Sequence, residues 1–162
     1  MLSACTASLT NLGGMESMIG RATYHDIMTE VPETLQRHGY AIYQNRDDGA
    51  NLYIETSWQE RAPLEDEAEI GVEDARTRFV ARARKAGPAL YTLRLSAENQ
   101  VRGALQSAEA PEGEETHEWS TIPATDMLKA YVEQITTEIQ LKVDAGLRTY
   151  GRPIRSGHVD RW

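Results

Sequence analysis

The chain has 162 residues and a formal net charge of −8; 40% of its residues are hydrophobic and 26% are charged. This balance is typical of one globular domain and excludes collagen-like, disulfide-rich and wholly disordered chains. No apolar run approaches the ~18 residues of a membrane span. The acidic balance argues against a nucleic-acid partner and against simple electrostatic docking on anionic lipid. Cys5 is the single cysteine and no Cys/His set has zinc spacing, so we expect neither a metal nor a cofactor.

The first part of the chain is predicted to be a tether followed by a helix. Residues 5–19 are small and polar and contain Gly13-Gly14, which indicates a flexible leader. Residues 21–38 carry an apolar stripe at helical spacing. Its members are Tyr24, Met28, Val31 and Leu35. Pro32 predicts a kink or the start of a second helix, and Gly39 predicts the end of the helical region.

Two stretches of alternating residues predict two β-hairpins. The first spans residues 40–58 around Asp48-Gly49, a dipeptide typical of hairpin turns. The second pairs residues 75–84 with 89–98 across a turn at Lys85-Ala-Gly-Pro88. Between the hairpins, residues 60–74 contain seven acids and one arginine, which predicts a charged connection without a strand.

The last part of the chain is predicted to be a loop, a long helix and a loose tail. Residues 104–123 are acidic and contain two prolines, which indicates a loop. Residues 125–148 carry an apolar stripe at helical spacing, with Thr125 as the capping residue. Residues 151–162 are predicted to be a loose C-terminal tail.

The resulting order, α-β-β-β-β-α, predicts the fold class. Consecutive hairpins give an antiparallel four-stranded sheet, and two helices packed on one face complete a two-layer α+β sandwich. The other face is expected to be wet. We expect a residual signal and tether over 1–20 and a single α+β domain over 21–150, followed by the tail over 151–162.

One predicted strand is rich in arginine. Four arginines share one of its faces, namely Arg76, Arg78, Arg82 and Arg84. They are candidates for a site that binds an anion or a partner, because guanidinium groups bind phosphate and lipid headgroup oxygens bidentately. The alternative is a solvent face paired with carboxylates of the neighbouring strands, Glu55 and Glu98, and this alternative is favoured.

Other motifs predict no catalytic chemistry. The acidic residues of 60–74 lack the spacing of a calcium loop, so a solvated loop is expected. No nucleophile elbow, zinc-protease motif or glycine-rich phosphate loop is present, so we expect a protein that is not an enzyme and has no catalytic residue. Trp58 is expected to be buried, and Trp119 is expected to anchor the acidic loop onto the domain.

The N-terminus resembles the lipobox of bacterial lipoproteins. Leu2-Ser3-Ala4-Cys5 matches the pattern L-[ASVI]-[GAS]-C at every position. The resemblance implies that Cys5 carries the lipid and anchors the protein to a membrane. Because no basic and apolar signal segment precedes the motif, we expect either that Met1 is not the true start or that the sequence is a truncated fragment. The alternative is an ordinary exposed cysteine in the loose N-terminus of a cytosolic protein. Thr6 after the cysteine implies the outer membrane, on its periplasmic side, more than the inner membrane.

The domain is similar in pattern to small α+β modules of outer-membrane assembly lipoproteins, such as the C component of the β-barrel assembly machine. The similarity covers residues 24–58: a helix ending in Leu35-x-x-x-Gly39-Tyr40, then a strand, the turn Arg46-Asp-Asp-Gly49 and a second strand. It implies a lipid-anchored cell-envelope protein that acts as a non-catalytic scaffold through a protein partner. The alternative is a module that binds a small ligand or anionic lipid at the arginine face or in the cleft between sheet and helices.

Overall fold

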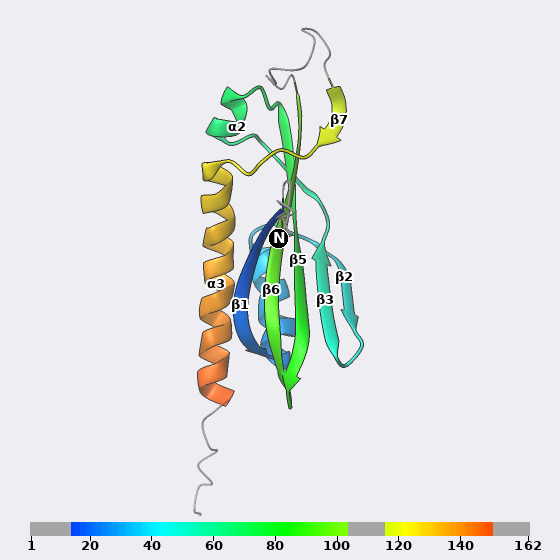
Figure 1. Ribbon diagram of the computed structural model, residues 1–162, viewed down its shortest axis with the longest axis vertical. Helices are drawn as coiled ribbons and strands as arrows, with labels where there is room; N and C mark the ends of the chain where they lie inside the picture. The colour runs from blue at the N-terminus through cyan, green and yellow to red at the C-terminus, as the bar shows by residue number, and fades with distance from the viewer. Residues whose placement is uncertain (1–13, 104–115, 151–162) are drawn as a thin grey trace, which may run out of the picture.

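The computed structural model describes residues 14–103 and 116–150. Its strands are β1 (Gly14–Thr23), β2 (Ile42–Asp47), β3 (Asn51–Thr56), β4 (Gln59–Arg61), β5 (Asp74–Gly87), β6 (Leu90–Gly103) and β7 (Thr116–Ser120). Its helices are the π-helical turn η1 (Asp26–Glu30), α1 (Val31–Arg37), α2 (Glu65–Glu69) and α3 (Asp126–Tyr150). The strands form one antiparallel sheet in the order β1-β6-β5-β3-β2, with β4 beside β5 and β7 beside β6 (Figure 1). The α+β class with an antiparallel sheet is therefore confirmed.

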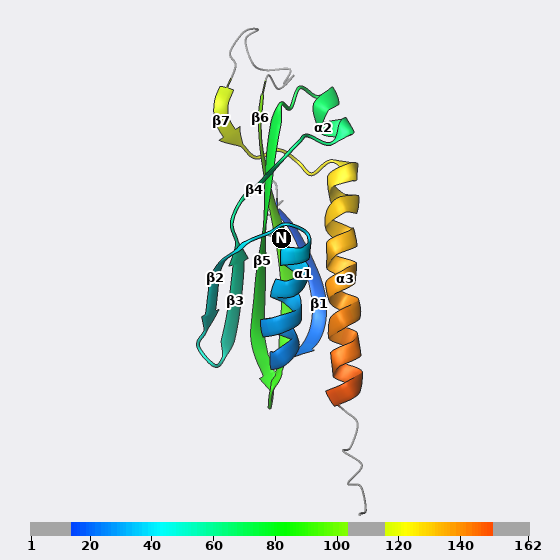
Figure 2. The ribbon, with the colours of Figure 1, turned by 180° about the vertical axis from the view of Figure 1, so that it is seen from behind.

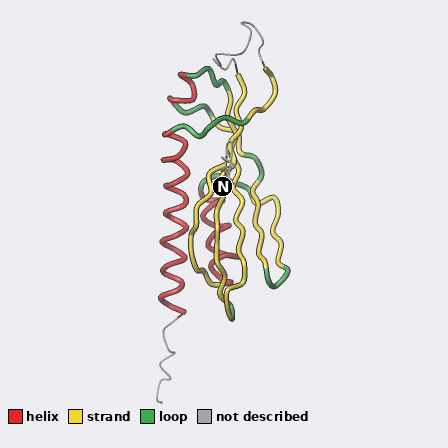
Figure 3. Tube along the Cα trace, viewed as in Figure 1, coloured by secondary structure: helices red, strands yellow, loops and turns green. Residues whose placement is uncertain are grey.

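The sheet has two unlike faces. Figure 2 shows the helical side, where α1 lies in front of the sheet and α3 runs alongside β1. Figures 1 and 3 show the opposite side, which the described helices leave uncovered. The two faces follow from the alternation in β6, where Leu93 and Leu95 are buried while Arg94 between them is exposed. We call the uncovered side the outer face.

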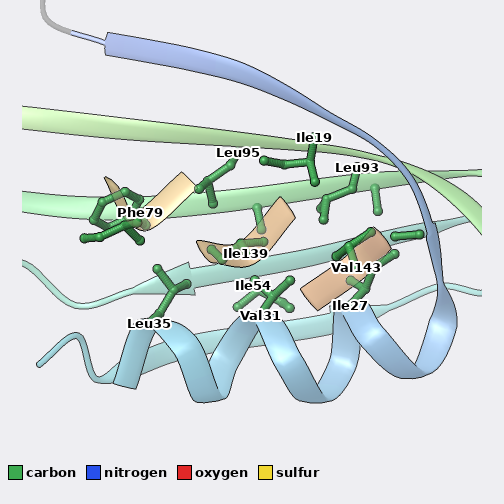
Figure 4. Close-up of a cluster of buried hydrophobic side chains, with 14 of the residues drawn as sticks. Ile19, Ile27, Val31, Leu35, Ile54, Phe79, Leu93, Leu95, Ile139 and Val143 are labelled. Carbon is green, nitrogen blue, oxygen red and sulfur yellow. The ribbon is translucent and has the colours of Figure 1, made fainter. Parts of the chain in front are cut away.

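The core lies between the sheet and the helices. Ile27, Val31 and Leu35 recur every fourth residue along η1 and α1, so their side chains form one stripe toward the sheet (Figure 4). The facing side chains are Ile54, Phe79, Leu93 and Leu95 from the sheet, with Ile139 and Val143 from α3. This stripe is displaced from the predicted one. Tyr24 is 40% exposed because β1 continues to Thr23 and the helical region begins only afterwards.

Strand β1 corrects the predicted tether. Residues 14–23 pair antiparallel with β6, with Ser17 opposite Leu95, so the predicted tether over 1–20 is too long and residues 14–20 belong to the sheet. The pairing partner is nearly 80 positions away in the chain, and local composition carries no sign of it. Residues 1–13, with Cys5 and the lipobox, lie outside the described residues, as does the tail over 151–162.

The predicted four-strand, two-helix arrangement is also incomplete. The acidic connection 60–74 contains the end of β4 and the short helix α2, and the predicted loop 104–123 contains β7. These pieces flank the far ends of β5 and β6, which extend well beyond the other strands (Figure 3). β4 pairs with β5, and β7 pairs with β6, in the part of the β5–β6 hairpin that β1 and β3 do not reach.

Several predictions about turns and helix ends are confirmed. The first hairpin turns at Gly49, whose φ of 82° is a conformation that glycine adopts readily. Gly39, with φ 89°, ends the region after α1, and Pro32 lies in the first turn of that helix. The Oγ1 of Thr125 accepts a hydrogen bond from the N–H of Leu128 and caps α3.

Candidate anion-binding site

The four predicted arginines lie on the outer face of β5. They alternate with Ala75, Thr77 and other buried residues that face the helices. The sheet separates the four into two environments along the strand. Arg76 and Arg78 lie toward β4 and β7, whereas Arg82 and Arg84 lie toward the hairpin turn.

Arg78 is paired with carboxylates of the neighbouring strands, as the favoured alternative predicted. Its guanidinium forms ion pairs with Glu55 on β3 at 2.6 Å and with Glu98 on β6 at 2.7 Å. These are the two carboxylates that the sequence predicted as its cross-strand partners. Arg78 is therefore neutralised within the sheet and does not offer its charge to a ligand.

Arg76 belongs to a column of stacked rings and guanidinium groups. Its guanidinium carbon lies 4.7 Å from the ring centroid of Trp58 and 4.2 Å from that of Trp119. Arg78 covers Trp58 at 4.7 Å, and Arg102 covers Trp119 at 4.8 Å. We call these five residues the Trp–Arg stack. Cation–π contacts contribute about 0.5–1 kcal/mol each at exposed sites, so the stack fastens β4 and β7 to the long hairpin.

The stack settles the two tryptophan predictions. Trp119 anchors the segment around β7, as predicted. The prediction that Trp58 is buried in the core is wrong. The segment from Glu55 to Gln59 has one residue more than the segment of β5 that it faces, from Val80 to Thr77. This extra residue reverses the alternation of side chains between the two faces, so Trp58 lies on the outer face.

Arg82 and Arg84 lie in a different setting. The register places Arg46, Tyr53, Arg82, Arg94 and Met18 side by side in one row that crosses β2, β3, β5, β6 and β1. The next row contains Asn51, Arg84, Thr92 and Arg21. Paired residues of an antiparallel sheet project to the same face, so both rows lie on the outer face.

The central residues of these two rows line a groove of about 600 Å³ that we call the basic groove. The polar residues that line it on the outer face are Asn51, Tyr53, Arg82, Arg84, Thr92 and Arg94; Lys85 borders the groove, but it pairs with the buried Tyr91, so its side chain projects to the helical side. Within residues 14–103 and 116–150, Arg82, Arg84 and Lys85 form no ion pair, whereas Arg94 pairs with the exposed Glu16 at 3.2 Å. Arg82 lies directly opposite Arg94, an arrangement of like charges that costs stability in a sheet.

Tyr53 forms one wall of the basic groove and is fixed in place. Its hydroxyl donates a hydrogen bond to Glu55 at 2.7 Å. Arg82 and Arg46 approach its ring at 5.6 and 5.9 Å. Burial raises the pKa of Tyr53, and the hydrogen bond to the Glu55 carboxylate raises it further. Tyr53 therefore adds no negative charge to the groove at neutral pH.

A second polar cluster, which the sequence did not predict, lies on the helical side. Glu67 of α2 is fully buried, and its carboxylate accepts hydrogen bonds from Arg61 at 2.7 and 2.8 Å. It also accepts the N–H of Leu64 and the side-chain amide of Asn99. The expectation of a solvated acidic loop is therefore wrong at Glu67. The only local hint is that Arg61 is the one cation of the acidic stretch.

This cluster is built to be stable rather than reactive. Burial by itself would raise the pKa of Glu67, but the hydrogen bonds from Arg61, Leu64 and Asn99 and the charge of Arg61 outweigh it and hold the pKa below its usual range. Nearby, burial and a 2.7 Å hydrogen bond with the Tyr131 hydroxyl raise the pKa of Tyr40 far above its ordinary value. Glu67 is thus charged and Tyr40 neutral at physiological pH, and each is held by partners.

The described part of the chain contains no helix that is long and apolar enough to cross a membrane. In the same residues, no group of three His, Cys, Asp or Glu side chains is placed to hold a metal ion. No protein-family model matches the chain, and no curated protein is significantly similar to it. The case for the basic groove as the candidate site therefore comes from the residues and geometry of this chain, without support from relatives.

Proposed function

We propose that the protein is a non-catalytic binding module that holds a multiply anionic ligand in the basic groove. The observation that supports this proposal is that Arg82 and Arg84, which form no ion pair with the described residues, line one groove on a chain of net charge −8. An acidic protein has carboxylates available to neutralise exposed arginines, as it does at Arg78. Among the described residues, no carboxylate forms an ion pair with Arg82 or Arg84.

The chemistry of the cations favours phosphate-bearing ligands. Two arginines two residues apart on one strand are separated by about 7 Å, so each can contact a different anionic group. Guanidinium forks match the oxygen geometry of phosphate and carboxylate groups. Thr92 on β6 adds a neutral hydrogen-bonding group beside Arg84, whereas the side-chain amide of Asn51 on β3 donates to Asp48.

The placement of the module remains a proposal that rests on the lipobox. Leu2-Ser3-Ala4-Cys5 supports lipidation at Cys5 and attachment in the cell envelope, on the periplasmic side of the outer membrane. A scaffold role through a protein partner in envelope assembly is the second candidate. It is supported by the close-packed core between sheet and helices, which resembles a rigid framework more than a ligand cavity.

Calorimetric titration with inorganic pyrophosphate tests the proposed function. We expect the wild type to bind, and Arg82→Gln combined with Arg84→Gln to lose binding while the circular dichroism spectrum is unchanged. Arg148→Gln is the matched control, because Arg148 is an exposed arginine near the end of α3. No binding by the wild type, or equal binding by the double variant, would contradict the proposal.

A further inference from the structure

We infer that the outer face around the basic groove docks directly on an anionic lipid bilayer. The inference rests on the proposed function, because the anions it names are the phosphate groups of lipid headgroups. The docking face consists of the two rows that contain Arg21, Arg46, Arg82, Arg84, Arg94 and Met18.

The docking face has the extent and exposure that a membrane surface needs. Its first row crosses five strands, a distance of about 19 Å at the usual spacing of strands. All five of its arginines are exposed; α1 lies on the opposite face of the sheet and α3 runs alongside the β1 edge (Figures 1 and 2). A bilayer can therefore reach the arginines together without displacing any described helix.

An exposed apolar side chain completes the row. Met18 lies opposite Arg94 on the edge strand β1 and is 54% exposed. At the other edge, Tyr43 of β2 lies in a bulge and is 73% exposed. Large apolar groups at the margins of a basic surface can enter the headgroup region while arginines bind the phosphates.

The distribution of charge reconciles docking with the net charge of −8. Glu16 is the carboxylate that forms an ion pair with this face among the described residues. Glu55 and Glu98 also lie on the outer face, where Arg78 neutralises them, and Asp47 and Asp48 lie at the β2–β3 turn, where backbone and side-chain groups of the turn bind them. Further acidic residues lie in α2, at the far ends of β5 and β6, and on α3. Screening limits their repulsion, because the Debye length is about 8–10 Å at physiological salt. The composition-based argument against anionic lipid therefore does not apply to this face.

Lipid fits this face better than single-stranded nucleic acid. Sheet faces that bind single strands offer free aromatic rings on which bases stack. Tyr53 is the aromatic side chain that lines the basic groove, and Arg46 and Arg82 already approach its ring. Met18 and Tyr43 are exposed at opposite edges of the sheet, so they provide no continuous stacking surface beside the arginines.

Vesicle co-sedimentation of the protein without any lipid attachment tests the inference. We expect binding to vesicles of phosphatidylcholine with phosphatidylglycerol, and no binding to phosphatidylcholine alone. Arg82→Gln with Arg84→Gln should weaken binding about 25-fold, which corresponds to about 1 kcal/mol per arginine. Met18→Ser should weaken it several-fold. The matched controls are Arg148→Gln and Leu141→Ser, since Leu141 is 65% exposed on α3.

The outcomes separate the inference from the proposed function. If pyrophosphate binds in the groove but anionic vesicles do not, the docking inference fails and the proposed function stands. If pyrophosphate does not bind, the proposed function fails and the inference fails with it. Competition of vesicle binding by soluble glycerol phosphate at equal phosphate concentration would show that the free anion is the ligand and overturn docking. Groove-dependent binding of single-stranded RNA without vesicle binding would also overturn it.

Discussion

Removing the carboxylate of Glu67 is predicted to be the most damaging single charge change in the described chain. Glu67 is fully buried, and the side chain of Arg61 is only 15% exposed. In Glu67→Gln the guanidinium keeps its contacts with Thr77, Asn99 and the Ala62 carbonyl but loses its counter-charge. Breaking one side of a buried pair costs about 3–5 kcal/mol, because the other charge stays buried without compensation.

Urea unfolding at neutral pH, followed by circular dichroism, measures this cost. The matched control is Glu69→Gln, two residues further along α2 and exposed, for which we expect a change within about 0.5 kcal/mol. Arg61→Met together with Glu67→Leu should recover much of the loss, because no buried charge remains. A cost for Glu67→Gln below about 1 kcal/mol, or a double variant as unstable as the sum of the singles, would refute the reasoning.

The same pair predicts a dependence of stability on pH. The pKa of Glu67 is lowered in the folded state, so its contribution is fully present above the unfolded value of about 4.3. That contribution is lost as the pH falls through the lower, folded value. The free energy of unfolding of the wild type should therefore fall more steeply below about pH 4 than that of Glu67→Gln. Equal slopes would contradict the pKa shift.

Three further predictions concern packing. Gly146→Ala should destabilise the fold by about 1–3 kcal/mol, because the Asp26 carboxylate occupies the space of the new methyl group. In an Asp26→Ala background the same change should stabilise the fold, because alanine favours a helix more than glycine does. Phe79→Ala should cost about 3–5 kcal/mol in chemical unfolding, since Phe79 is fully buried and packs edge-on against Tyr40 at 4.8 Å. Trp119→Leu should speed hydrogen exchange in β7 with little effect on β3, and unchanged protection would argue against the stack as its anchor.

The parts of the fold that sequence predicted correctly are those that depend on neighbours in the chain. Asp48-Gly49 determines its own turn, and Thr125 caps the helix that it precedes. The apolar stripe of α3 needs only its own period to indicate its buried face. In each case the physical cause lies within about one helical or hairpin turn of the residue.

The parts that were missed depend on distant partners. Strand β1 is recognised only through its pairing with β6, and Glu67 turns inward because Asn99 and Arg61 meet it there. The arginine strand shows the same limit at the candidate site. Sequence supplied the face and the partners of Arg78. It could not show that the register places Arg94, and not a carboxylate, opposite Arg82. This difference distinguishes Arg82 from Arg78, which pairs with Glu55 and Glu98.

The central claim is that the basic groove binds anions, and calorimetric titration of pyrophosphate into the wild type and the Arg82→Gln/Arg84→Gln variant tests it most directly. We predict saturable binding to the wild type, binding of the same strength to Arg148→Gln, and loss of binding in the double variant with its fold retained. Binding that is as strong in the double variant as in the wild type would contradict the claim.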